Sequence, residues 1–248
     1  MVPVLLVTGG SRGIGAATAR AAAAAGWDVA INYTRDQAAA NAVAAQVQGL
    51  GRRALVLRGD VGNEADVKTI FVAIDREFGA LHGLVNNAGV VDVACRVDAM
   101  SSARLLRMFN INVIGSMLCA REALLRMSTR HGGSGGVIVN LSSAAARLGS
   151  PGQYVDYAAA KGAIDTFTLG LAREVAAEGV RVNAVRPGII DTEIHASGGQ
   201  PGRALQMAPQ VPMQRVGSAD EVAQAIVWLL SEGSSYTTGA VLDVTGGR

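Results

Sequence analysis

The sequence predicts an α/β protein with a doubly wound, mostly parallel sheet of seven strands flanked by helices. Short apolar runs alternate with helical stretches along the whole 248-residue chain, as in parallel sheets with crossover helices. The runs are continuously apolar rather than alternating, which is typical of strands covered on both faces. The strands are expected at Val4–Val7, Val29–Tyr33, Ala54–Leu57, Leu84–Val85, Val137–Leu141, Val180–Val185 and Val241–Val244.

Helical stretches fill the gaps between these runs. Ile14–Ala25 is rich in alanine, the strongest helix former, and ends near Gly26, which favours a helix C-terminus. Ser101–Arg130 is long enough for one extended helix and is followed by a glycine-rich segment. The other helices are expected at Gln37–Leu50, Val67–Phe78, Tyr157–Ala177 and Asp220–Leu230.

No repeat, linker or charge run divides the chain, so residues 1–248 are expected to form one domain. The one long irregular stretch is His195–Gly217, which is rich in Gly, Pro, Gln and Met. Loops of this length inside a compact domain are usually functional. We therefore expect a substrate lid there, with a plain surface insertion as the alternative.

The composition excludes several classes of protein. The 22 basic and 20 acidic residues are interspersed, giving a net charge of +2, so no charged face for nucleic acid or an anionic membrane is expected. No apolar stretch approaches the ~20 residues that span a bilayer, and no basic segment precedes the first apolar run, so a cytoplasmic protein is expected. Cys95 and Cys119 are interpreted as reduced apolar packing residues. His82, His131 and His195 have no ligand-spaced partners, so no metal site is expected.

A glycine-rich turn follows the first strand and leads into the first helix: Thr8-Gly9-Gly10-Ser11-Arg12-Gly13-Ile14-Gly15. Its spacing is G-x-x-x-G-x-G, not the G-x-G-x-x-G of the common dinucleotide fingerprint. The physical consequence is the same, because glycines allow a tight turn and let a phosphate approach the backbone and the helix N-terminus. The position of this turn at the first strand–helix junction predicts dinucleotide binding.

Further motifs follow in chain order: Asn86-Asn87-Ala88-Gly89, Asn112, Ser143, Tyr157-Ala158-Ala159-Ala160-Lys161, and Pro187-Gly188 with Thr192. Together with the glycine turn they resemble the short-chain dehydrogenase/reductase family, from Val4 to Gly247. The resemblance implies a Rossmann-type domain, NAD(P)-dependent hydride transfer between the cofactor and a small carbonyl or alcohol substrate, and a homotetramer. Within the family, the chain is most similar to 3-oxoacyl-carrier-protein reductases and glucose dehydrogenases.

The resemblance implies a catalytic tetrad of Asn112, Ser143, Tyr157 and Lys161. Tyr157 and Lys161 share one face of a helix at i,i+4 spacing. A nearby ammonium lowers the pKa of a phenol, ordinarily ~10, toward the range useful for general acid–base catalysis. By the family pattern, Ser143 hydrogen-bonds to the substrate oxygen and Lys161 binds the nicotinamide ribose. Asn112 supports a proton relay through water.

The catalytic serine is ambiguous, because Ser142 and Ser143 are adjacent. Counting back from Tyr157 by the family's usual spacing reaches Ala144, so the segment before the tyrosine is one residue longer than usual. We favour Ser143, the second serine of the pair, and Ser142 stays the alternative.

The resemblance also assigns the cofactor site. The residues expected to bind the cofactor are Gly9, Ser11, Arg12, Gly13, Ile14, Gly15, Asn32, Tyr33, Arg35, Asp60, Val61, Asn87, Ala88, Gly89, Tyr157, Lys161, Pro187, Gly188, Ile190 and Thr192.

The end of the second strand bears on which cofactor is used. NAD enzymes of this kind usually carry an acid there for the adenosine ribose, whereas this strand ends Asn32-Tyr33-Thr34-Arg35. Asp36 is expected to begin the next helix instead. Arg12 and Arg35 offer paired donors for a 2′-phosphate, which favours NADP(H), with NAD(H) and solvated arginines as the alternative.

The substrate pocket is expected to be shaped by Ala94–Ala99, Leu148–Val155 and the His195–Gly217 lid, whose residue types fit many carbonyl compounds. The rival function is a non-catalytic NAD(P)-binding sensor on the same fold. The intact tetrad argues against it, since a sensor does not need Tyr157 and Lys161 together.

Overall fold

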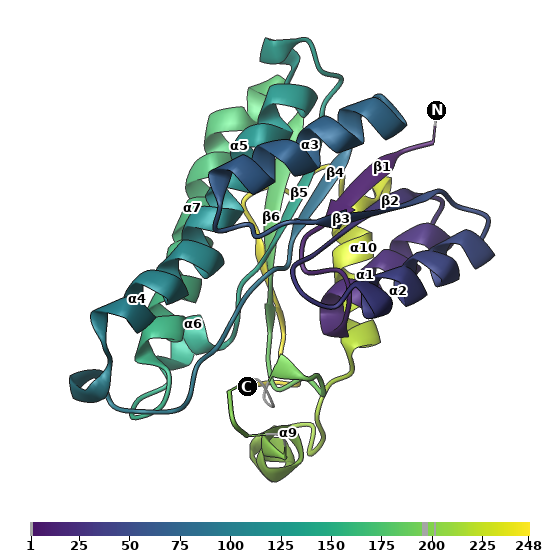
Figure 1. Cartoon of the computed structure of the whole chain (residues 1–248). Coiled ribbons are helices and arrows are strands. Elements are labelled where there is room, and N and C mark those ends of the chain that lie inside the picture. Colours follow the sequence, from purple (N-terminus) through teal and green to yellow (C-terminus); the bar gives the residue numbers. More distant parts are fainter. Residues whose placement is uncertain (1, 195–197, 201) are drawn as a thin grey trace.

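The protein, here as a computed structural model that describes residues 2–194, 198–200 and 202–248, has a seven-stranded sheet between two layers of helices (Figure 1). The strand order is β3-β2-β1-β4-β5-β6-β7 and all pairings are parallel. The strands are β1 (Val4–Val7), β2 (Asp28–Tyr33), β3 (Ala54–Arg58), β4 (Gly83–Asn86), β5 (Gly136–Leu141), β6 (Val180–Pro187) and β7 (Val241–Val244). The predicted fold class is confirmed.

The helices cover both faces of the sheet (Figure 1). One layer contains α1 (Gly13–Ala24), α2 (Gln37–Gly49) and α10 (Ala219–Leu230), and the other contains α3 (Glu64–Phe78), α5 (Gly115–Met127) and α7 (Val155–Val175). Alternate residues of β1 serve the two layers: Leu5 and Val7 pack in the first apolar cluster, Val4 and Leu6 in the second. Because both faces are buried, every residue of this strand is apolar.

The helix predicted over Ser101–Arg130 is present but interrupted. It consists of α4 (Ser102–Phe109), a π-helical turn (Asn110–Ile114) and α5. The Asn112 side-chain amide donates to the Met108 carbonyl at 3.0 Å, so it competes for the acceptor that its own N–H would use in an α-helix. Such π turns recur at functional sites. The helix ends at Met127, before the predicted boundary, because Ser128 is extended and its hydroxyl caps the next turn.

The irregular stretch predicted over His195–Gly217 contains regular structure. Residues 195–197 and 201 lie outside the described residues. In the described remainder, α9 (Arg203–Met207) leads into a 3₁₀ turn (Ala208–Gln210), and Gly217 bridges to Ile190. The prediction of an irregular loop is therefore wrong for this part, because Ala204 is buried and anchors a short helix. The role of the segment as a lid stays a prediction.

The strand order positions the functional site. The chain runs outward from β1 to β2 and β3, then returns to β4 on the other side of β1. The carboxyl ends of β1 and β4 therefore lie side by side at the point where the order reverses, the usual ligand site of doubly wound sheets. The glycine turn leaves β1 there, and Asn87-Ala88-Gly89 leave β4.

Candidate active site

The turn after β1 is shaped by its glycines. Gly9 and Gly13 have φ angles of +61° and +53°, a region that residues with a Cβ rarely adopt. A Cβ on Gly15 would lie 2.4 Å from the Gly9 carbonyl oxygen, so the first turn of α1 packs directly on the backbone of the loop. The turn therefore brings the N-terminus of α1 to the carboxyl edge of the sheet.

Thr8 and Asn87 join this turn to the end of β4. The Thr8 hydroxyl accepts hydrogen bonds from the N–H groups of Asn87 and Ala88, both at 3.0 Å. The Asn87 amide nitrogen donates to the carbonyls of Thr8 at 2.8 Å and Gly9 at 3.0 Å. These bonds hold two of the motifs identified in the sequence against each other.

Asn32 anchors the end of β2. Its buried side chain accepts from the Gly9 N–H at 3.2 Å and donates to the carbonyls of Leu57 at 3.3 Å and Gly59 at 3.0 Å. It thereby ties the glycine turn to the end of β3. All of these hydrogen bonds of the Asn32 side chain are made to backbone groups of the site.

Asp36 begins α2, as predicted, and its carboxylate accepts the Ala39 N–H at 2.9 Å. Tyr33 ends β2 and is buried. Arg12 and Arg35 are exposed and line the same pocket as Asp36. The residue at the predicted position of an acid is therefore a tyrosine, and the next acid along the chain, Asp36, caps a helix.

The N-terminus of α1 suits an anion. The helices α2, α3 and α10 begin with side chains that accept a backbone N–H, namely Asp36, Asn63 and Ser218. In the described chain, Arg12, the residue before α1, makes no such cap, and the first turn of α1 contains no acid. Uncapped N–H groups at a helix N-terminus bind phosphate. Together with Arg12 and Arg35, these groups fit the phosphates of a dinucleotide.

A pocket of about 640 Å³ brings the predicted cofactor and catalytic residues together. Every residue predicted to bind the cofactor lines it except Gly15, which packs behind the turn. Ser143, Tyr157 and Lys161 line the same pocket, whereas Asn112 lies behind its wall.

Tyr157 and Lys161 lie in the first two turns of α7, beside the end of β5. The Lys161 ammonium nitrogen is 5.7 Å from the centroid of the Tyr157 ring and donates to the Leu141 carbonyl at 2.6 Å. Ser143 hydrogen-bonds to the Tyr157 side chain and accepts the Ala145 N–H at 3.1 Å. Ser143 and Lys161 therefore both lie next to the Tyr157 side chain.

The two adjacent serines occupy different environments. Ser142 is buried, and its hydroxyl donates to the Lys161 carbonyl at 3.2 Å. Ser143 is partly exposed and bonds to Tyr157. This difference favours Ser143 as the residue that meets a substrate and gives Ser142 a structural contact.

Burial dominates the ionisation of the catalytic pair. It raises the pKa of Tyr157 to about 12, opposed by the Ser143 hydrogen bond. It lowers the pKa of Lys161 to about 8, opposed by the charge of Asp165. The expected fall in the pKa of Tyr157 is therefore wrong for this structure, because loss of solvation raises it.

A row of alternating charges lies behind Lys161. Asp165, one helical turn further along α7, accepts from Arg186 at 2.9 Å. Arg186 also pairs with Asp243 at 2.8 Å, and Asp243 pairs with Arg147 at 2.7 Å. The second oxygen of Asp165 is buried and has no hydrogen-bond partner among the described residues. The lysine therefore borders a charge network that ties three neighbouring elements to α7.

Asn112 is fully buried in the π turn. Its side-chain oxygen accepts from the Val90 N–H at 3.1 Å, and its nitrogen donates to the carbonyls of Val90 and Met108, both at 3.0 Å. A Cβ on Gly89 would lie 2.8 Å from the Asn112 oxygen and 3.7 Å from the Lys161 nitrogen. Asn112 is thus close to the lysine, but its side chain fixes the backbone at Val90. Its part in a proton relay stays a prediction.

The substrate end of the pocket differs in part from the prediction. Residues 90–92 line it, and within the described chain none of Ala94–Ala99 does. That loop turns away because the Cys95 N–H bonds to the Gln153 carbonyl at 3.1 Å and a 3₁₀ turn follows. From Leu148–Val155, the lining residues are Leu148, Ser150 and Tyr154.

Three arginines of the pocket were not named as site residues from the sequence, although Arg203 lies within the segment predicted to be the substrate lid. Arg107 lies on α4 and pairs with Asp92 at 3.5 Å. Arg203 lies on α9 with its guanidinium 5.3 Å from the centroid of the Tyr154 ring, and Arg248 ends the chain. Single arginines usually lie in solvated positions, so no signal in the sequence separated these three from the others.

The described residues contain no group of three His, Cys, Asp or Glu side chains that would hold a metal ion. No helix in this part of the chain is both long and apolar enough to cross a membrane.

Comparisons with known proteins agree with this geometry. Residues 9–248 match a family model described as enoyl-(acyl carrier protein) reductase. The chain is 54% identical over 245 residues to the uncharacterized oxidoreductase YgfF of Escherichia coli, with 99% of both chains covered. It is 36% identical over 255 residues to an NADPH-dependent aldehyde reductase-like protein of Arabidopsis thaliana, with 98% of this chain and 93% of the relative covered.

A solved structure shares the fold and its name states the family. It is a short chain dehydrogenase from Burkholderia cenocepacia in complex with NADP, similar with a TM-score of 0.91 at 33% identity over 100% of this chain and 98% of the other. The sequence motifs, the sheet order and these matches agree along the chain. The protein therefore belongs to the short-chain dehydrogenase/reductase family of NAD(P)-dependent oxidoreductases.

Proposed function

We propose that this protein transfers hydride between NADP(H) and a carbonyl or alcohol substrate, with Tyr157 as general acid and base. The observation that carries the proposal is the convergence of Ser143, Tyr157 and Lys161 in the pocket that also contains the glycine turn after β1. The nicotinamide cofactor, when bound, supplies or accepts the hydride. The residues of the chain hold the substrate oxygen and move its proton.

Tyr157 moves the proton. In the direction of reduction, Ser143 and Tyr157 donate hydrogen bonds to the carbonyl oxygen, and the phenol proton passes to it. Burial raises the pKa of Tyr157 to about 12, so the phenol is protonated and able to donate at neutral pH. The Lys161 ammonium, whose nitrogen is 5.7 Å from the centroid of the Tyr157 ring, stabilises the phenolate that remains. In the direction of oxidation, this phenolate takes the proton of the alcohol.

Substitution of Tyr157 tests this role. Tyr157→Phe keeps the ring and removes the proton donor, so kcat is expected to fall by ~10²–10⁴-fold, with cofactor affinity nearly unchanged. Turnover is followed by nicotinamide absorbance with a panel of ketones, aldehydes, sugars and alcohols. Near-normal turnover in Tyr157→Phe would contradict the assignment. Cofactor binding without turnover of any substrate by the unsubstituted protein would favour the sensor.

The preference for NADP(H) rests on charge. The end of β2 carries Tyr33 where an acid would meet the ribose of NAD, and Arg12 and Arg35 lie in the same pocket. The NADP complex of the Burkholderia relative and the NADPH dependence in the name of the Arabidopsis relative support the same choice.

Comparing kcat/KM for the two cofactors tests the preference. We expect an NADP(H) advantage of about tenfold or more, equivalent to ~1.4 kcal/mol. Arg12→Ala and Arg35→Ala should shrink it, because each removes a donor for the 2′-phosphate. Arg58→Ala is the matched control, since Arg58 is exposed at the end of β3 and outside the pocket. A preference of the unsubstituted enzyme for NAD(H) would refute this part of the proposal.

We also propose that the protein assembles as a homotetramer through the helices around the π turn. Several large apolar side chains on these elements are exposed: Leu106, Phe109, Ile114, Met117 and Leu125. Apolar surface of this kind marks an interaction site. Light scattering measures the assembly, and a monomer at micromolar concentration would contradict it.

A further inference from the structure

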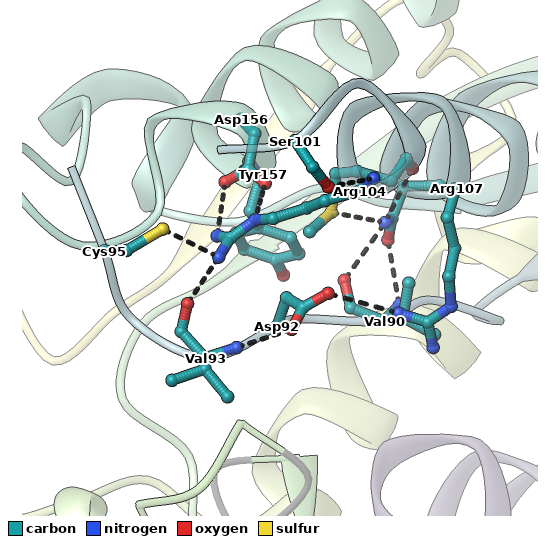
Figure 2. A network of polar contacts seen from close by, with 11 residues as sticks. Val90, Asp92, Val93, Cys95, Ser101, Arg104, Arg107, Asp156 and Tyr157 are labelled. Carbon is teal, nitrogen blue, oxygen red and sulfur yellow. Dashed lines mark hydrogen bonds and ion pairs between the residues drawn. The ribbon is translucent and has the colours of Figure 1, made fainter. Parts of the chain in front are cut away.

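We propose that Arg104 is a positioning residue for this reaction, which fixes the loop at the substrate end of the pocket to the first turn of the helix that carries Tyr157. The inference rests on the proposed function, because it gives Arg104 a task in that reaction. It comes from a polar network around this one side chain (Figure 2).

The Arg104 guanidinium joins three segments (Figure 2). Its Nε and Nη2 donate to the two carboxylate oxygens of Asp156, at 2.8 Å and 3.2 Å. Its Nη1 donates to the Val93 carbonyl at 2.5 Å and to the Cys95 sulfur at 3.0 Å. The arginine itself is fixed at the start of α4, where its N–H bonds to the Ser101 hydroxyl at 3.2 Å. One side chain thus connects α4, the loop after β4 and the start of α7.

The network corrects the interpretation of one cysteine. Both cysteines are free, as expected. Cys119 is buried on α5, and burial raises the pKa of its thiol to about 12. Cys95, in contrast, is partly exposed and accepts a hydrogen bond from Arg104, so it is not an apolar packing residue.

The ion pair is more deeply buried than the other ion pairs in the described chain. The Arg104 side chain is 10% exposed and that of Asp156 is 0% exposed. Burying two charges gives up their solvation, so such a pair is a weak way to gain stability. A two-point contact between guanidinium and carboxylate does, however, fix orientation. The pair is therefore suited to hold the two segments in one arrangement.

Both partners of this pair are next to the walls of the pocket. On the loop, residues 90–92 line the substrate end directly before Val93. On α7, Tyr157 follows Asp156, and its N–H donates to the Asp156 carboxylate at 2.9 Å. A change in the ion pair therefore moves the pocket wall relative to the proton donor. Displacements of about 1 Å at a reacting centre reduce rates by ~10²-fold.

The chain offers a matched control. Arg126 on α5 makes a similar two-point contact with Asp75 on α3, at 2.8 Å and 2.7 Å, and its side chain is 18% exposed. Neither residue lines the pocket. Arg126→Lys therefore disturbs an ion pair of the same type at a distance from the site.

The experiment compares Arg104→Lys with Arg126→Lys by amide hydrogen exchange and by kinetics. Lysine keeps the charge but cannot bond to Asp156 at two points and to Val93 together. We expect exchange to rise about tenfold or more in both residues 91–95 and residues 155–158 of Arg104→Lys, and kcat/KM for the carbonyl substrate to fall about tenfold or more. Cofactor affinity should stay within about twofold of the unsubstituted protein. Arg126→Lys should show neither effect.

Two results would overturn the inference. One is exchange in Arg104→Lys that stays within about twofold of the unsubstituted protein in either segment. The other is a loss of kcat/KM no larger than in Arg126→Lys. The exchange measurement needs no turnover, so it is distinct from Tyr157→Phe, which tests the proposed function itself.

A second variant covers the case in which Arg104→Lys does not fold. The double substitution Arg104→Leu with Asp156→Leu leaves no buried charge unpaired, and such replacements are often neutral or stabilising. We expect this variant to fold and still to lose kcat/KM by about tenfold or more, because the loop is no longer fixed. An unchanged kcat/KM in this folded variant would contradict the positioning role.

Discussion

The two ends of the pocket are built from different kinds of group. At the glycine turn, backbone N–H and carbonyl groups and the neutral amides of Asn32 and Asn87 make the contacts. At the tyrosine, the contacts come from charged side chains with little exposure, such as Lys161 and the Arg104–Asp156 pair.

The difference follows from the two tasks. A phosphate site needs donors and room, which an uncapped helix N-terminus and glycines provide without buried charge. A proton-transfer site needs groups with shifted pKa values, and burial is the strongest cause of such shifts. Substitutions that add bulk should therefore damage the end of the pocket at the glycine turn. Substitutions that remove polar or charged groups should damage the end at the tyrosine.

At the tyrosine end, the two adjacent serines are expected to differ sharply in their effect on kcat. Ser143→Ala should lower kcat by ~10²–10³-fold, since it removes a donor to the reacting oxygen. Ser142→Ala should leave kcat within a few-fold and lower the free energy of unfolding by about 1 kcal/mol, because among the described residues its hydroxyl bonds only to the Lys161 carbonyl. Steady-state kinetics and urea denaturation separate the two. A greater loss of kcat in Ser142→Ala would reverse the assignment.

At the glycine end, a single methyl group should be enough to impair binding. A Cβ at Gly15 would lie 2.4 Å from the Gly9 oxygen and 2.5 Å from the Asn87 amide nitrogen. Gly15→Ala is therefore expected to raise the Kd of NADP(H) by ~100-fold, as an ångström-scale displacement of positioned groups does.

Gly170→Ala is the matched control, because Gly170 is exposed in α7 and a Cβ there would meet nothing within 4 Å. It should leave the Kd unchanged and stabilise the helix by up to ~1 kcal/mol. Titration of nicotinamide fluorescence measures both proteins, and equal Kd values would show that the turn tolerates a side chain.

The two ends also differ in how far the sequence predicts them. The sheet and the glycine turn could be predicted because buried strands and glycine spacing are local patterns. The Arg104–Asp156 pair could not, because its members are 52 residues apart and each resembles a solvated helix residue. The shift in the pKa of Tyr157 was predicted in the wrong direction. The sequence shows that Lys161 follows Tyr157 by four residues, but it does not show that Tyr157 loses solvation. Burial depends on the whole fold.

The last of these effects is a dependence of stability on pH that belongs to the tyrosine end alone. Burial lowers the pKa of Lys161 from 10.5 in the unfolded chain to about 8 in the folded protein. Between these values the unfolded chain binds more protons than the folded one, so the free energy of unfolding rises with pH. Without cofactor, it should rise by about 2–3 kcal/mol more in the unsubstituted protein than in Lys161→Met between about pH 8 and pH 10.

Urea denaturation at successive pH values measures this difference. Gly15→Ala is the control from the other end of the pocket, and its stability should follow the pH dependence of the unsubstituted protein because no titrating group is changed. If the stabilities of the unsubstituted protein and of Lys161→Met run parallel over this range, Lys161 titrates at its ordinary pKa. The tyrosine end would then lack the buried ammonium that distinguishes it from the glycine end.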